Sequence, residues 1–393
     1  LSRLLNFVIL TPFLTREFDP EPYGVVTDLY AWAALLMVLF TYRMETAFFR
    51  FGSRDEDLEK SYSTAVLSLL GSTAVLLAVF LLLAPQLAAW LEYPEHPEYV
   101  RWFALIIAFD ALAAIPFARL RLDNRPVRFA IVKTLNVLLN LFFIYFFLRI
   151  CPWLLEQGYS WAGWLYQEET GVGYVFLSNL IASAFVLLLM LPEYRRLQWR
   201  FDGALWRRML VYAAPLLVVG VAGIVNQFVG IPMLKRLASD DLEYNLELVG
   251  QYGAAAKLAV LMNLFTQAFN YAAEPFFFRN AARDDKSVLY AQVGQGFTLV
   301  GSLAFLGIML YMDIIQFYLG ADLREGLPVV PLLLLAYLML GLYYNFSIWY
   351  KLADRTVIGG YIAVGGSVIT ISLNYLFIPQ IDFMALGWAA LAC

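Results

Sequence analysis

Long apolar runs recur along the whole chain, with short polar turns between them. Most runs hold about 20 residues, which is the length that an α-helix needs to cross the hydrocarbon core of a bilayer. Turn sequences such as Asp123-Asn124-Arg125-Pro126 separate the runs. The pattern predicts membrane spans at 1–14, 24–48, 62–84, 99–118, 128–149, 172–191, 208–231, 250–273, 288–310, 327–349 and 357–377, and a twelfth from 385. The first and last are incomplete, so we expect a fragment truncated at both ends.

One segment of the chain repeats another. Residues 23–55 align with residues 252–284 without a gap, and 12 of the 33 positions are identical. The identities include charged and aromatic residues at fixed offsets, such as Glu45 with Glu274 and Arg50 with Arg279. Internal repeats of membrane spans are a known architecture of secondary transporters, so the repeat favours a transporter.

Lys and Arg residues are distributed unequally between the two sets of loops that the spans define. One set carries 20 of them and the other carries six, with Lys257 left out because it lies within a span. The six are Arg16, Arg101, Arg149, Lys235, Arg236 and Arg324. The positive-inside rule places the richer set, and with it the N-terminus, in the cytoplasm.

This topology makes the two copies of the repeat run in the same direction, as in transporters built from parallel repeats. We therefore expect two six-helix lobes around a central cavity, at residues 1–192 and 205–393. A basic segment, 193–204, joins them on the cytoplasmic side.

Composition excludes several other classes. Hydrophobic residues make up 62% of the chain and charged residues 15%, whereas soluble domains have roughly 45–50% and about 25%. The chain is thus predicted to be an all-α polytopic membrane protein. Two cysteines and one histidine, His96, offer neither a metal-ligand spacing nor a histidine-based catalytic set. We expect no enzyme activity, no metal, no cofactor and no nucleic-acid partner.

Several short motifs resemble a known family. Phe13-Leu14-Thr15-Arg16, Tyr23-Gly24-Val25-Val26 and Met44-Glu45-Thr46-Ala47-Phe48-Phe49-Arg50 resemble the opening of bacterial polysaccharide (O-antigen-type) flippases. These belong to the multidrug/oligosaccharidyl-lipid/polysaccharide exporter superfamily. In the second half, Val249-Gly250-Gln251-Tyr252-Gly253 and Ala272-Ala273-Glu274-Pro275 look like that family's eighth helix. One departure is Gly230-Ile231, where such relatives often carry an Asp-Arg pair, so any role of that pair is not carried over.

The resemblance implies an alternating-access flippase in the bacterial cytoplasmic (inner) membrane. Its expected substrate is an undecaprenyl-diphosphate-linked oligosaccharide for surface polysaccharides such as O-antigen lipopolysaccharide. The expected partners are this lipid-linked oligosaccharide, membrane lipids and a polysaccharide polymerase. Coupling to a proton or sodium gradient is left open.

Polar side chains inside the spans are the candidate substrate-binding residues, because they are costly in hydrocarbon unless they face a cavity or one another. Asn263, Gln267 and Asn270, with Glu274, are spaced to share one helix face. The further candidates are Arg43, Lys133, Asn136, Asn140, Asn226, Gln227 and Lys257. Amides would bind sugar hydroxyls, and Arg43 and Lys133 would meet the diphosphate. The competing interpretations are interhelical hydrogen bonding for the amides and snorkelling to headgroups for the cations.

Glu45 with Arg50, and Glu274 with Arg279, occupy equivalent places in the two repeats. They are interpreted as gate residues that latch the lobes together, or alternatively as a folding motif that pins each helix end to its own loop.

Two other functions remain open at this stage. A drug or organic-cation antiporter of the same superfamily would need an acidic, aromatic cavity, and Arg43 and Lys133 argue against one. A membrane-embedded glycan polymerase or ligase usually has a large outer loop with catalytic residues, and no loop is long enough for that.

Overall fold

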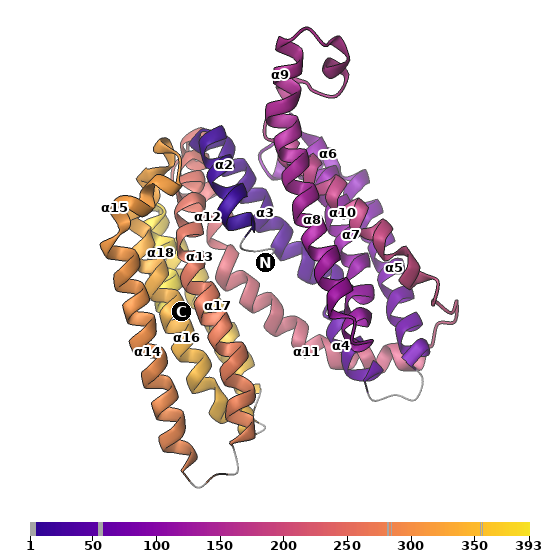
Figure 1. Ribbon diagram of the computed structural model, residues 1–393, viewed down its shortest axis with the longest axis vertical. Coiled ribbons are helices and arrows are strands. Elements are labelled where there is room, and N and C mark those ends of the chain that lie inside the picture. The colour runs from indigo at the N-terminus through magenta and orange to yellow at the C-terminus, as the bar shows by residue number, and fades with distance from the viewer. Residues whose placement is uncertain (1–4, 54–57, 281–282, 284, 354, 356) are drawn as a thin grey trace. The chain divides into compact units, whose positions relative to one another are not determined.

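The structure is a computed structural model that describes residues 5–53, 58–280, 283, 285–353, 355 and 357–393. All regular elements in these residues are helices (Figure 1). Ten helices in the described residues are long and apolar enough to cross a membrane. The prediction of an all-α polytopic membrane protein is therefore confirmed.

The chain forms two compact units, of which the first contains residues 1–6 and 33–221. Its long helices are α5 (Leu58–Leu82), α7 (Pro97–Leu122), α8 (Pro126–Tyr145), α10 (Gly173–Tyr194) and most of α11 (Gly203–Phe228). Helix α8 continues through the short π-helix η2 (Phe146–Ile150) into α9 (Cys151–Glu156), and the three elements form one rod (Figure 1). The short elements are α4 (Met44–Gly52), α6 (Ala84–Trp90), η3 (Ser160–Trp164) and η4 (Glu168–Thr170).

The second unit contains residues 7–32 and 222–393. Its long helices are α13 (Leu242–Arg279), α14 (Lys286–Leu310), α16 (Val330–Leu352), α17 (Val357–Ile381) and the first half of α3 (Pro20–Thr41). The shorter elements are η1 (Asn6–Leu10), α2 (Thr11–Glu17), α12 (Gly230–Leu237), α15 (Met312–Ile315), η5 (Gln316–Tyr318), η6 (Ala321–Val329) and α18 (Met384–Ala392).

Helices α3 and α11 each contribute to both units, because the division falls after Trp32 and after Val221. The boundaries of the compact units differ from those of the lobes predicted at 1–192 and 205–393. The division into these two lobes stays a prediction.

Side-chain caps fix where two of the long helices begin. Asp241 precedes α13, and its carboxylate accepts hydrogen bonds from the backbone N–H groups of Glu243 and Tyr244. Asp202 precedes α11 and accepts from the N–H of Leu205 at 2.9 Å. The hydrogen bond from Lys60, supported by the one from Leu205, lowers the pKa of Asp202 to about 2. The helix start is therefore anchored by a charged carboxylate at neutral pH.

Glycines allow α3 and α13 to cross closely within the second unit. A methyl group placed on Gly24 would lie 2.0 Å from the carbonyl oxygen of Leu246, and one on Gly250 would lie 1.9 Å from that of Pro20. Gly253, the repeat partner of Gly24, lies against Thr27. Small residues at such crossings allow helix backbones in membranes to approach each other. The glycines of the repeat therefore shape a helix contact.

Candidate functional site

Arg43 lies at a break between two helices of the first unit. Helix α3 ends at Thr41 and α4 begins at Met44, and both intervening residues have positive φ angles, 33° at Tyr42 and 58° at Arg43. The prediction of one continuous span at 24–48 is therefore wrong. Non-glycine residues in this conformation are strained and cluster at functional sites.

The guanidinium group of Arg43 packs against the backbone of α11 at Gly220. A methyl group on Gly220 would lie 2.5 Å from Nε and Nη2 of Arg43. The Nε atom is buried and makes no hydrogen bond within the described part of the chain. Glu45, in the first turn of α4, interacts electrostatically with Arg43 and Arg121. Arg43 is thus a half-buried cation that pairs directly with no carboxylate among the described residues.

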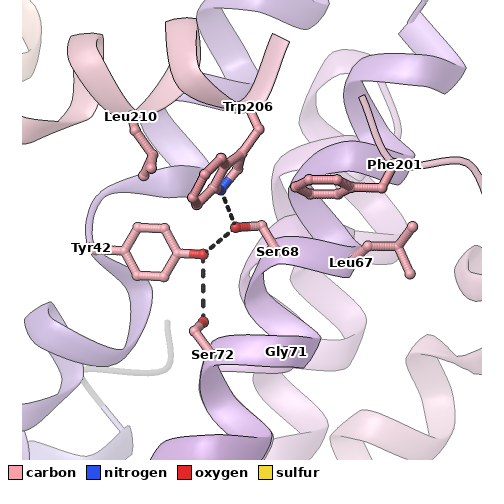
Figure 2. A pocket seen from close by; sticks show the side chains of 8 residues that line it. All are labelled: Tyr42, Leu67, Ser68, Gly71, Ser72, Phe201, Trp206 and Leu210. Carbon is pink, nitrogen blue, oxygen red and sulfur yellow. Dashed lines mark hydrogen bonds between the residues drawn. The ribbon is translucent and has the colours of Figure 1, made fainter. Parts of the chain in front are cut away.

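A pocket lies beside this break, also within the first unit (Figure 2). It has a volume of about 480 Å³, and its lining comes from Tyr42, from α5, from the segment before α11 and from the start of α11. Figure 2 shows a chain of hydrogen bonds from Trp206 through Ser68 and Tyr42 to Ser72. No lining residue was among the sequence-based candidates, since serines and aromatics in an apolar span give little signal.

The other candidates of the first unit already have protein partners or are partly buried. Lys133 Nζ lies 4.2 Å from the ring centroid of Phe117 and interacts electrostatically with Asp110. Asn136 is half-buried and Asn140 is buried. Arg50 stacks on Tyr212 of α11 at 4.1 Å, and the ion pairs of the described residues do not include one between Arg50 and Glu45. A diphosphate contact at Lys133 and a latch at Arg50 stay predictions.

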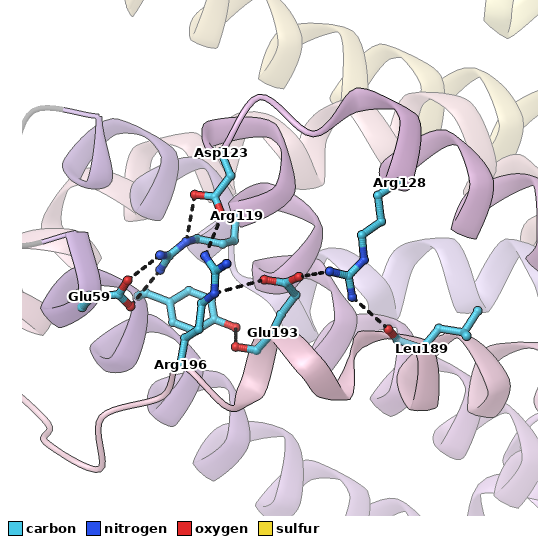
Figure 3. Close-up of polar contacts among 8 residues, drawn as sticks. Glu59, Arg119, Asp123, Arg128, Leu189, Glu193 and Arg196 are labelled. Atoms are coloured by element: carbon cyan, nitrogen blue, oxygen red, sulfur yellow. Dashed lines mark hydrogen bonds and ion pairs between the residues drawn. The ribbon is translucent and has the colours of Figure 1, made fainter.

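A network of charged side chains at one end of the first unit was not predicted (Figure 3). Arg119, only 3% exposed, binds both carboxylate oxygens of Glu59 and also bonds Asp123. The remaining members, Arg196, Arg128 and Glu193, join α8 and α10 to this cluster. In the sequence, each of these residues looks like an ordinary charged residue in a loop at the end of a span. Together they pair the buried Arg119 and Glu193 with partly exposed charges from neighbouring helices, which indicates a structural clamp.

In the second unit, the stripe on α13 is half-buried. Gln267 donates a hydrogen bond from Nε2 to Asn263 Oδ1 at 2.9 Å, and Asn270 and Glu274 are also half-buried. Lys257 and Arg279 are exposed. The role of the stripe in substrate binding stays a prediction.

Asn226 and Gln227, near the end of α11, differ in their surroundings. Asn226 donates to the carbonyl of Ala363 and accepts from Thr370 Oγ1, both at 3.4 Å, which joins α11 to α17. This geometry favours the alternative interpretation of interhelical hydrogen bonding for Asn226. Gln227 is exposed.

The sequence analysis also missed a buried ion pair in the second unit. Lys235 Nζ of α12 lies 3.2 Å from Asp28 Oδ2 of α3, and their side chains are 2% and 0% exposed. Lys235 had been counted as an outer loop cation, whereas it lies on a helix and is buried. A lone acid within an apolar span is a functional or structural signal that could have identified Asp28.

The candidate residues thus fall into two sets. Arg43, Glu45, Arg50, Lys133, Asn136 and Asn140 belong to the first unit, and the others belong to the second. The predicted convergence of the two sets of residues on one cavity stays a prediction.

The fold is shared with solved structures of membrane transporters. The chain is similar to a multidrug resistance MATE family transporter of the MOP superfamily, in an inward-facing conformation, with 12% identity and a TM-score of 0.72 over 100% of this chain and 90% of the other. It is also similar to the lipid II flippase MurJ, with 15% identity and a TM-score of 0.73 over 100% and 82%. A third relative is the Vibrio cholerae MATE transporter VcmN, with 11% identity and a TM-score of 0.58 over 99% and 94%.

Within this class the family is defined by sequence. Residues 1–281 match the family described as polysaccharide biosynthesis protein, and the chain belongs to that family. A search of curated protein sequences finds no significant match. The suspected relationship to the polysaccharide flippases of this superfamily is confirmed by the family match and the two-lobe transporter fold of the structural relatives.

Proposed function

We propose that the protein is a flippase that moves an undecaprenyl-diphosphate-linked oligosaccharide across the bacterial cytoplasmic membrane, with its N-terminus in the cytoplasm. The family match and the transporter fold support a role in polysaccharide export. A lipid-linked glycan with a diphosphate must carry its anionic group through the low-dielectric interior of the membrane. An unpaired anion there would be prohibitively costly, so such a transporter needs a fixed cation.

Arg43 is the observation that carries the proposal. Its guanidinium is half-buried, its Nε has no hydrogen-bond acceptor among the described residues, and a strained backbone holds it in place. Guanidinium groups bind phosphate oxygens through two directed, charge-assisted hydrogen bonds. A diphosphate would supply the missing acceptors. An organic cation would be repelled by this group, which disfavours the antiporter alternative.

The variant Arg43→Ala is expected to abolish polysaccharide export without loss of membrane insertion, and Arg43→Lys should retain part of it. Lysine keeps the positive charge but cannot form the bidentate hydrogen bonds of a guanidinium group. The measurement is surface polysaccharide in a flippase-null strain that carries each variant at matched membrane levels. Near wild-type export by Arg43→Ala would show that Arg43 only interacts with headgroups, and would remove the main support for the proposal.

Gly220 and Gly223 provide a matched pair for the same assay. The three atoms nearest to a methyl group on Gly220 all belong to the flexible end of Arg43, whereas a methyl group on Gly223 meets no atom within 4 Å. Gly220→Ala should therefore displace the guanidinium and lower export, while Gly223→Ala should leave export unchanged. Equal export by the two variants would contradict the role assigned to the position of Arg43.

A further inference from the structure

A surface loop of the first unit is fastened to α5 at two points. The backbone N–H of Gln198 donates to Ser63 Oγ at 2.9 Å, and that of Asp202 donates to Thr64 Oγ1 at 3.4 Å. Ser63 and Thr64 are fully buried, so both anchors hold the loop against the helix. The residues between the anchors are Trp199, Arg200 and Phe201.

The three residues between the anchors are exposed. Trp199 is 80% exposed, Phe201 is 51% exposed, and Arg200 is exposed as well. The loop thus holds two large aromatic side chains in positions where the described part of the chain leaves much of their surface uncovered. Exposed aromatic side chains of membrane proteins, Trp above all, gather at the level of the lipid headgroups, so the loop has the composition of an interfacial anchor.

Exposed arginines accompany the two aromatic rings. They are Arg195, Arg200, Arg207 and Arg208. The only acidic residue between positions 195 and 208 is Asp202, which pairs with Lys60 at 2.6 Å. The ion pairs of the described residues include none of the four arginines. This side of the loop therefore carries positive charge that fits the anionic lipids of the cytoplasmic leaflet.

The pocket of Figure 2 adjoins the loop, because Phe201 is part of its lining. The polar hydrogens of the lining have acceptors within the protein. Trp206 Nε1 donates to Ser68 Oγ at 2.7 Å, and Ser68 Oγ lies 2.6 Å from Tyr42 Oη. Ser72 Oγ donates to the backbone carbonyl three residues earlier at 3.3 Å. The pocket therefore requires no polar ligand, and its free surface consists of rings and aliphatic carbons.

An exposed apolar stripe on α5 leads away from the pocket. It begins at Gly71, which lines the pocket, and continues through Val75 and Val79 to Leu82. The spacings of four, four and three residues place these positions on one helix face. With a rise of 1.5 Å per residue the stripe is about 16 Å long. A hydrocarbon chain covers the pocket and this stripe together, whereas a sugar ring leaves the stripe uncovered.

We propose that the first unit binds an anionic phospholipid of the cytoplasmic leaflet at this place. One acyl chain lies in the pocket and along the stripe on α5, and the headgroup phosphate lies among the exposed arginines of the loop. Two of these arginines, Arg200 and Arg207, are the sequence neighbours of the lining residues Phe201 and Trp206. The positive-inside rule assigns the same loop to the cytoplasmic side, where the anionic headgroups are.

The lipid site has its own cations and is separate from the position of Arg43. The guanidinium of Arg43 packs at Gly220, which lies ten positions after the pocket residue Leu210 in α11. That separation is about 15 Å along the helix. The inference therefore does not rest on the proposed function. Because Tyr42 lines the pocket, a bound lipid contacts the break between α3 and α4 and is expected to stabilise it.

The test measures binding of radiolabelled dioleoylphosphatidylglycerol to the purified full chain in dodecyl maltoside, with dioleoylphosphatidylcholine as the neutral comparison. The anionic lipid should bind saturably and raise the thermal unfolding midpoint, and the neutral lipid should bind at least 5-fold more weakly. Arg207→Gln should weaken binding of the anionic lipid about 5-fold, as expected for one basic residue beside an anionic headgroup. Arg101→Gln is the matched control, since Arg101 is exposed and predicted on the opposite side of the membrane.

A second variant tests the place of the acyl chain. A methyl group on Gly71 meets no atom within 4 Å, so a leucine side chain has room there and would fill the pocket. Gly71→Leu should therefore remove saturable binding of dioleoylphosphatidylglycerol and leave the protein folded, because leucine is a better helix former than glycine. Gly296→Leu on α14 is the matched control, since Gly296 is also exposed with no atom within 4 Å of an added methyl group.

Four results would overturn the lipid site. They are equal binding of the two phospholipids, equal effects of Arg207→Gln and Arg101→Gln, binding that survives Gly71→Leu, and displacement of dioleoylphosphatidylglycerol by another ligand. Displacement by equimolar undecaprenyl phosphate would identify the chain of a polyprenyl lipid as the occupant. Displacement by a methyl glycoside would identify a sugar.

Discussion

The variant Asp28→Ala is expected to lose about 3–5 kcal/mol of folding stability, because it removes one partner of a buried ion pair with the ammonium group of Lys235. The two side chains are 0% and 2% exposed and lie 3.2 Å apart. Burying an ion is costly, and attraction to its partner offsets that cost only while both are present. Lys235→Ala should have a similar effect. The measurement is the thermal unfolding midpoint of the purified protein in detergent.

A double variant separates charge pairing from packing at this site. Asp28→Leu combined with Lys235→Met removes both charges and keeps apolar volume, so it should recover most of the stability that either single change loses. The surface pair of Lys60 and Asp202 is the control, with side chains 46% and 25% exposed. Lys60→Met should leave the midpoint nearly unchanged. Single variants at Asp28 that unfold like the wild type would contradict the role of the pair.

The second large effect is expected at Gly24. In Gly24→Ala the new methyl group would lie 2.0 Å from the backbone oxygen of Leu246, and neither helix backbone can move away without disturbing its neighbours. Overpacking usually costs about 1–3 kcal/mol, and this clash between two backbones should reach the upper end of that range. Thermal unfolding and membrane yield both measure it.

Gly294→Ala on α14 provides the control for Gly24→Ala, because a methyl group there meets no atom within 4 Å. It should be neutral or slightly stabilising, as Ala is a better helix former than Gly. If the two variants behaved alike, the close crossing of α3 and α13 would not exist in the folded protein.

Hydropathy and turn signals predicted most of the helices because bilayer-spanning length is a strong constraint. The predictions fail where tertiary contacts determine where a helix begins, breaks or ends. The span predicted at 24–48 has no Gly or Pro at its break, yet Tyr42 and Arg43 adopt positive φ angles. The span predicted at 250–273 extends over Leu242–Arg279 in α13. Polar residues in its added turns are satisfied by other segments, as when Asn245 donates to the carbonyl oxygen of Lys235 at 2.9 Å.

Polar residues were identified from sequence more reliably than their partners. Asn226 was recognised as a polar residue inside a span, but its bonds to Ala363 and Thr370 depend on a helix more than 130 residues away in sequence. Lys235 and Asp28 are separated by 207 positions, so no local pattern could pair them. Arg43 was a candidate from its type and place alone, and its contact with Gly220 required the fold.

The most direct test of the central claim is reconstitution of the purified protein into liposomes that contain a fluorescent undecaprenyl-diphosphate-linked oligosaccharide. A membrane-impermeant quencher reports how much of the glycan has reached the outer leaflet, with a proton or a sodium gradient imposed. The account predicts movement of the glycan with the wild type, and none with Arg43→Ala or with empty liposomes. Uptake of an organic cation such as rhodamine 6G, with no movement of the lipid-linked glycan under either gradient, would contradict it.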